Sequence, residues 1–73
     1  MTVTPLYLFR HLRRWTQKEL AERAGLERVS VVLIETGKRQ PRLDTANKLA
    51  LALGVPTDIL FPPEDQGGGD NAA

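Results

Sequence analysis

Cysteine is absent from the 73 residues of this chain, and histidine occurs once, as His11. The lack of cysteine excludes disulfides and thiolate chemistry and is typical of a reducing cytoplasm. One histidine and scattered carboxylates provide neither a metal site nor a nucleophile with its base, so we expect no enzyme, no cofactor and no small-molecule ligand. Near the N-terminus the longest apolar run, residues 6–9, is ended by Arg10. We therefore expect no membrane span and no secretory signal, and a soluble, cytoplasmic protein.

Acidic and basic side chains are nearly balanced, nine against ten, but they are unevenly distributed. Residues 62–73 contain Glu64, Asp65 and Asp70, two prolines, three consecutive glycines and no basic residue. This composition predicts a disordered acidic, glycine-rich tail. A solvated tail without a function is favoured over a tail that acts as a regulatory switch. Residues 1–61 then form one small domain in which ten basic side chains face six acidic ones, a net charge of +4.

Helix signals occur throughout the domain, and no alternating strand pattern competes with them. We expect five helices, over residues 5–13, 17–24, 28–36, 43–53 and 56–60. Thr4 can cap the first helix, Pro5 suits its first position, and Leu6 and Phe9 are expected to be buried. The predicted fold is a compact all-α five-helix bundle.

Residues 16–37 have the layout of two short helices joined by a glycine turn, as in a helix-turn-helix DNA-binding motif. Thr16 and Glu19 have the spacing of a capping box, and Gly25 follows the helix where a chain leaves through positive φ. In the second helix Val31 and Ile34 form the inward face. The outward face contains Arg28, Val29, Val32, Leu33 and Thr36.

The chain resembles the Cro/C1-type helix-turn-helix family of bacterial and phage regulators, also called the XRE family, from about residue 6 to residue 61. The most specific matches are Thr16-Gln17, Glu19-Leu20-Ala21, Gly25-Leu26, Ile34-Glu35, Gly37, Pro41, Leu49-Ala50 and Leu53-Gly54-Val55. The resemblance implies a lambda-repressor-like DNA-binding domain that regulates transcription by binding double-stranded DNA.

The resemblance also implies which residues contact DNA. Base contacts are expected from residues of the helix over 28–36, namely Arg28, Val29, Ser30, Val32 and Leu33. Arg28 can bind guanine in bidentate fashion, whereas the three aliphatic residues can recognise only thymine methyl groups or DNA shape. Phosphate contacts are expected from Gln17, Thr36, Lys38, Arg39 and Arg42. Gln17 can also brace the start of the second helix of the motif.

Other positions are given a structural role. Arg10 and Glu35 match positions that form a partly buried ion pair in the family, and Trp15 is expected to pack at the core or its rim. His11 is expected to be solvated. Arg14 replaces a glycine common in the family and must adopt a left-handed backbone unless the turn differs.

Two further expectations concern partners. A homodimer is expected because one short helix contacts only a few base pairs. The expected contact between its subunits consists of Val55, Ile59, Leu60 and Phe61. Alternatively, these four residues only complete the core. The three aliphatic residues of the helix over 28–36 also suit a protein contact. The alternative function is therefore a protein-interaction module, such as an antitoxin or a partner-bound coregulator.

Overall fold

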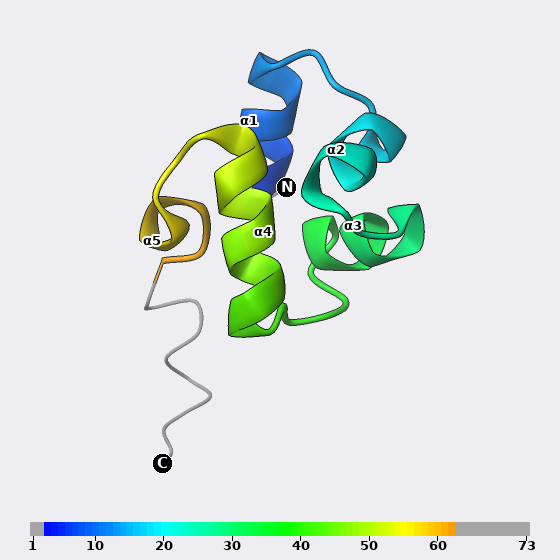
Figure 1. Cartoon of the computed structure of the whole chain (residues 1–73). Helices are drawn as coiled ribbons and strands as arrows, with labels where there is room; N and C mark the ends of the chain where they lie inside the picture. Colours follow the sequence, from blue (N-terminus) through cyan, green and yellow to red (C-terminus); the bar gives the residue numbers. More distant parts are fainter. Residues whose placement is uncertain (1–2, 63–73) are drawn as a thin grey trace.

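Five helices make up the regular structure of residues 3–62, the part of the chain that the computed structural model describes. They are α1 (Pro5–Leu12), α2 (Gln17–Ala24), α3 (Arg28–Glu35), α4 (Leu43–Leu53) and α5 (Thr57–Leu60). The predicted all-α five-helix fold is confirmed, and no strand occurs within these residues. Figure 1 shows α2 and α3 together on one side of α4, with α5 on its other side.

Local signals explain where the helices begin and end. The side chain of Thr4 accepts a hydrogen bond from the Tyr7 N–H, and Thr16 and Glu19 form the predicted capping box. Gly25 ends α2 and Gly54 ends α4, each with φ of 73°, a conformation that glycine adopts without steric cost. The predicted bounds of α1, α3 and α5 were each one residue too long.

The core receives at least one fully buried side chain from each helix. These are Leu6, Leu20, Val31, Leu49, Leu53 and Leu60. Two predictions need correction: Phe9 is only half-buried, and Leu60 is 1% exposed and therefore cannot form a dimer contact. Leu60 is covered because α5 packs against both α1 and α4, so its short apolar face closes one side of the bundle.

Arg14 has φ of 60°, the left-handed conformation predicted for this position. No helix among residues 3–62 is long and apolar enough to cross a bilayer. The predicted tail falls, except for Pro62, outside the described residues, so the division of the chain at residues 61 and 62 stays a prediction.

Candidate nucleic-acid interface

The helix-turn-helix unit is built as its sequence predicts. Helix α2 packs directly against α3, and the turn between them passes through Gly25 in the left-handed conformation. The backbone N–H of Leu26 donates to the carbonyl of Ala21 at 2.8 Å. The Gly25 N–H also donates to carbonyls in the last turn of α2. These hydrogen bonds close the end of α2 and direct the chain into α3, so a short, hydrogen-bonded turn sets the angle between the two helices.

The outward face of α3 is less exposed than predicted. Val31, Ile34 and Glu35 point into the bundle and are buried. Arg28 and Val29 are exposed, Val29 to 53%, and they present the first turn of α3 to solvent. The remaining predicted base-contacting residues are half-buried, namely Ser30, Val32 and Leu33. The expectation of three exposed aliphatic side chains on this helix was therefore wrong for two of them.

The segment after α3 accounts for part of this difference. We call residues 36–42 the basic loop, because it contains Lys38, Arg39 and Arg42, all of which are exposed. The loop folds back on the end of α3, and the N–H groups of Lys38 and Arg39 both donate to the Leu33 carbonyl, at 2.8 and 3.1 Å. The Arg39 guanidinium also reaches Ser30 Oγ at 3.4 Å. The loop thus folds against α3 and brings the Arg39 guanidinium to Ser30 in the first turn of that helix.

Thr36 contributes less freely than expected. Its hydroxyl donates a hydrogen bond to the Val32 carbonyl at 2.8 Å. The hydroxyl hydrogen is therefore already engaged and is not free to form a hydrogen bond with a phosphate oxygen. No side-chain cap precedes either α3 or α4, where Glu27 and Arg42 occupy the capping positions.

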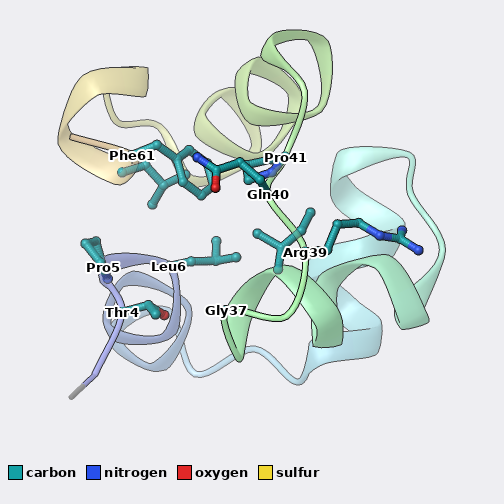
Figure 2. Close-up of a pocket in the computed structure, with 10 residues that line it drawn as sticks. Thr4, Pro5, Leu6, Gly37, Arg39, Gln40, Pro41 and Phe61 are labelled. Atoms are coloured by element: carbon teal, nitrogen blue, oxygen red, sulfur yellow. The ribbon is translucent and has the colours of Figure 1, made fainter. Parts of the chain in front are cut away.

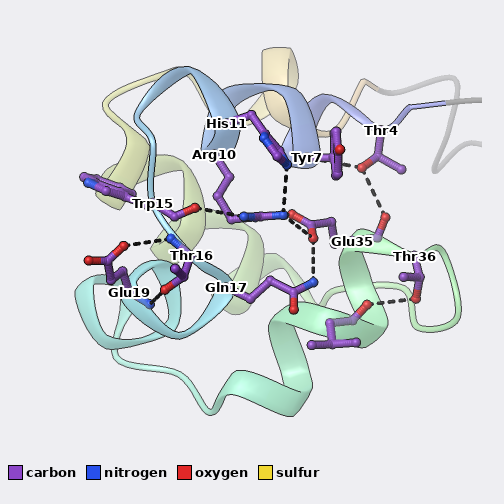
Figure 3. A network of polar contacts seen from close by, with 11 residues as sticks. Thr4, Tyr7, Arg10, His11, Trp15, Thr16, Gln17, Glu19, Glu35 and Thr36 are labelled. Carbon is purple, nitrogen blue, oxygen red and sulfur yellow. Dashed lines mark hydrogen bonds and ion pairs between the residues drawn. The ribbon is translucent and has the colours of Figure 1, made fainter.

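A buried polar network joins α1, α2 and α3 behind this surface (Figure 3). Arg10 and Glu35, 8% and 5% exposed, form an ion pair with Nε to Oε2 at 2.6 Å and Nη2 to Oε1 at 3.0 Å. The Arg10 Nη1 also donates to the Trp15 carbonyl at 2.8 Å. The guanidinium therefore spans from α1 to the turn before α2 and to the last residue of α3.

Gln17 belongs to the same network. Its Nε2 donates to Glu35 Oε1 at 2.7 Å. The side chain therefore braces the end of α3, and the prediction that it braces the start of this helix was wrong. The reason is that the first turn of α2 lies beside the C-terminal end of α3. The bond holds the N-terminus of α2, whose free N–H groups favour an anion, in a fixed position relative to α3.

Three neighbouring residues complete the description. Trp15 is half-buried, and the Arg23 guanidinium lies 4.4 Å from its ring centroid, in keeping with a packing role. His11 is exposed, with its ring 4.1 Å from that of Tyr7. Residues 3–62 hold no cluster of side chains suited to a metal ion.

The sequence did not identify two contacts of this region. The Thr4 hydroxyl, expected only as a helix cap, also donates to the Glu35 carbonyl at 3.2 Å and links the start of α1 to the end of α3. Arg13 donates to the Leu53 carbonyl and links α1 to the end of α4. Neither partner is near in sequence, and no local pattern marks such a bond.

Comparisons with known proteins agree with this geometry. Residues 6–60 match the model of the helix-turn-helix family. An uncharacterized HTH-type transcriptional regulator of Methanocaldococcus jannaschii is 38% identical over 60 residues, which cover 82% of this chain and 91% of that protein.

Two solved structures are similar in both fold and sequence. The hypothetical transcription factor NHTF from Neisseria aligns with a TM-score of 0.73 and 36% identity, over 85% of this chain and 72% of that one. The restriction-modification controller protein C.AhdI from Aeromonas hydrophila aligns with a TM-score of 0.75 and 35% identity, over 78% of this chain and 86% of that one.

The buried ion pair generates a stability prediction. Glu35→Ala should lower the free energy of unfolding by about 3 to 5 kcal/mol, because it leaves the Arg10 guanidinium buried without its counter-charge. The double variant Arg10→Met/Glu35→Leu should be destabilised by much less than the sum of the effects of Arg10→Met and Glu35→Leu alone. Urea unfolding followed by circular dichroism measures each variant, and the double variant remains informative if Glu35→Ala does not fold.

A matched control is the exposed pair of Lys48 and Asp44, whose charged atoms are 3.9 Å apart. Lys48→Ala should cost no more than about 1 kcal/mol. Equal costs for Lys48→Ala and Glu35→Ala would contradict a special role for the buried pair.

Proposed function

Because this chain belongs to the Cro/C1-type (XRE) helix-turn-helix family, we propose that it is a sequence-specific, DNA-binding transcriptional regulator. It acts without catalysis: α3 enters the major groove, and α2 crosses the phosphate backbone. The observation that supports this function most directly is the position of the basic loop. The contact between the Arg39 guanidinium and Ser30 Oγ supports it, because a cation suited to a phosphate then lies beside the first turn of α3, where groups suited to bases are exposed.

The two kinds of contact come from different parts of this surface. Arg28 is exposed at the start of α3 and binds a guanine edge through two hydrogen bonds, while Ser30 offers a hydroxyl. Val29, Val32 and Leu33 contribute contacts with thymine methyl groups and sensitivity to DNA shape. Phosphates are bound by Lys38, Arg39 and Arg42, with Gln17 at the start of α2. Thr36 would join them only if its hydroxyl gave up the bond to the Val32 carbonyl.

The alternative, a protein-interaction module using the apolar face of α3, has less support in this structure. Val29 is the one large apolar side chain of α3 that is mostly exposed, and a single side chain makes too small a patch for a stable protein contact. The regulator is therefore the function we propose.

Selection of bound sequences from a random double-stranded DNA pool tests the function. We expect enrichment of a motif with two-fold symmetry for the wild-type protein, and a loss of information at one base position in each half-site for Arg28→Ala. Retention of the pool without any enriched motif, while the protein remains folded, would contradict sequence-specific binding.

The division between base and phosphate contacts leads to a second prediction. Arg28→Ala should weaken binding to the selected site by about 1 to 3 kcal/mol and leave binding to scrambled DNA nearly unchanged. Lys38→Ala should weaken binding to both and reduce the slope of log affinity against log salt by about one. Fluorescence anisotropy titrations at several salt concentrations separate the two patterns. Equal losses on both duplexes for Arg28→Ala would make it a phosphate contact.

We also infer that the protein binds DNA as a homodimer. Among the four residues first expected at the contact, Ile59 is exposed to 51%, while Val55 and Phe61 pack partly against the core. Leu51 is a further candidate, because it is 84% exposed on α4. The sequence marks it as an apolar residue outside the buried stripe of its helix.

Leu51 lies close to α5. The Thr57 hydroxyl donates to Asn47 Oδ1 at 2.7 Å, so the face of α4 that contains Asn47 adjoins α5. Residues four apart share one face of a helix, which places Leu51 one turn further along that face. A dimer formed through α4 and α5 would hold its two copies of α3 about 34 Å apart, which is the length of one turn of DNA, on a pseudo-palindromic site.

Sedimentation of the free protein and of its DNA complex measures the dimer. Leu51→Ser/Ile59→Ser should shift the free protein toward monomer or, if pairing occurs only on DNA, abolish the two-to-one complex. Leu43→Ser, which removes another mostly exposed leucine from the opposite end of α4, should do neither. A wild-type protein that is monomeric in solution and binds DNA as one protein molecule per duplex would contradict the homodimer.

A further inference from the structure

A pocket of about 150 Å³ lies between the basic loop, the start of α1 and the end of α5. Its apolar walls consist of the buried side chains Leu6, Ile34 and Leu60 and the half-buried side chains Pro5, Pro41 and Phe61. Figure 2 shows Phe61, Gln40 and Pro41 on one side of this space and Leu6 on the other. Because the lining residues come from separate segments of the chain, no local sequence pattern marks the pocket.

Most polar side chains around the pocket already have partners. The Thr4 hydroxyl donates to the Glu35 carbonyl at 3.2 Å, and the Arg39 guanidinium reaches Ser30 Oγ at 3.4 Å. The Gln40 carboxamide makes no hydrogen bond within the described part of the chain. A buried water needs about two to four polar partners. One free carboxamide among apolar side chains therefore suits an apolar ligand with one polar group better than a cluster of waters.

The volume of the pocket limits the size of this ligand. Drug-sized ligands occupy pockets of about 300 to 1,000 Å³, whereas a protein cavity of about 150 Å³ lined by leucine, isoleucine and phenylalanine accommodates one benzene ring. The same residue types line the pocket of this protein. Apolar walls without a neighbour forfeit dispersion contacts. A single aromatic ring restores those contacts, and one hydroxyl group on the ring bonds to the Gln40 carboxamide.

One wall of the pocket belongs to the basic loop and consists of Gly37, Arg39, Gln40 and Pro41. The N–H groups of Lys38 and Arg39 hold the loop to the Leu33 carbonyl of α3, whereas toward α5 the loop borders the pocket. A ligand in the pocket packs against the loop and restrains it in its position beside α3. Restraint of the loop before DNA arrives reduces the ordering cost that DNA binding must meet.

We propose that this pocket binds a small, mostly apolar molecule with the size of one aromatic ring and one hydroxyl group, and that its occupancy strengthens DNA binding. The ligand is then an effector that acts through the basic loop. Binding of the ligand is independent of DNA, but its effect on DNA affinity rests on the proposed function. The inference replaces the expectation of no small-molecule ligand, which was based on the lack of catalytic and metal-binding groups.

Benzyl alcohol tests the site. In amide NMR spectra of the full chain we expect saturable shifts at residues 37–40 and 60–61, with a midpoint of about 1 mM for a ligand of this size. Gln40→Trp should abolish the shifts by filling the pocket. Lys38→Trp is the matched control and should retain them, because it places the same side chain on a loop residue that does not line the pocket. Gln40→Leu should weaken binding of benzyl alcohol about threefold to tenfold without weakening binding of toluene, which has no hydroxyl group.

Fluorescence anisotropy titrations of duplex DNA test the effect on affinity. Saturating benzyl alcohol should tighten DNA binding by the wild-type protein about threefold to tenfold, and DNA should tighten binding of benzyl alcohol by the same factor, because coupling between two sites is reciprocal. Gln40→Trp should lose this response. Lys38→Trp should keep it, starting from a weaker DNA affinity because a cation is lost.

Shifts that grow without saturation, or saturable shifts that Gln40→Trp leaves unchanged, would overturn the site. If a second copy of the chain fills the pocket, benzyl alcohol will not bind saturably and Gln40→Trp will move the free protein toward monomer in sedimentation, which also overturns the proposal. Saturable binding with unchanged DNA affinity would overturn the effector role. Saturable binding by a protein that binds no duplex would confirm the site and contradict the proposed function instead.

Discussion

A carboxylate buried beside a guanidinium cannot move away without leaving two charges unpaired in a region that excludes water. In this protein the carboxylate is that of Glu35, the last residue of α3, and its partner is Arg10 of α1. The same carboxylate accepts a hydrogen bond from Gln17 at the start of α2. Three helices are thereby held together at one point, and α3 can change its orientation only if all of these bonds break.

The two ends of α3 are held in different ways. Its C-terminal end is anchored by the Glu35 network and by the N–H groups of the basic loop on the Leu33 carbonyl. Its N-terminal end has no side-chain cap and presents Arg28 to solvent. An anchored helix with an open first turn is well suited to the major groove, because base contacts come from the open end and the angle of entry is set by the other.

Positive charge on the surface of α3 and the basic loop is modest and local. Residues 1–61 have a net charge of only +4, so attraction to DNA depends on where their cations lie. The basic loop contains three of them directly after α3, and the Arg39 guanidinium contacts Ser30 of that helix. Exposed cations on one short stretch of the chain make binding to a polyanion sensitive to salt without changing the fold.

The sequence by itself determined the helices and their ends. Caps at Thr4 and Thr16, left-handed glycines at Gly25 and Gly54, and apolar spacing act between residues no more than about four apart, so their effects are visible in the order of residues. Motif spacing was also sufficient to pair Arg10 with Glu35, through resemblance to a family and not through local physics.

Only the tertiary structure decided which surfaces remain available. Leu60 became core and Leu51 stayed exposed, Gln17 turned to the end of α3, and Phe61 came to rest beside the basic loop. Each of these outcomes depends on the packing of helices that are distant in sequence. Burial is a property of the assembled bundle, since the same apolar side chain is covered or exposed according to which helix lies against it.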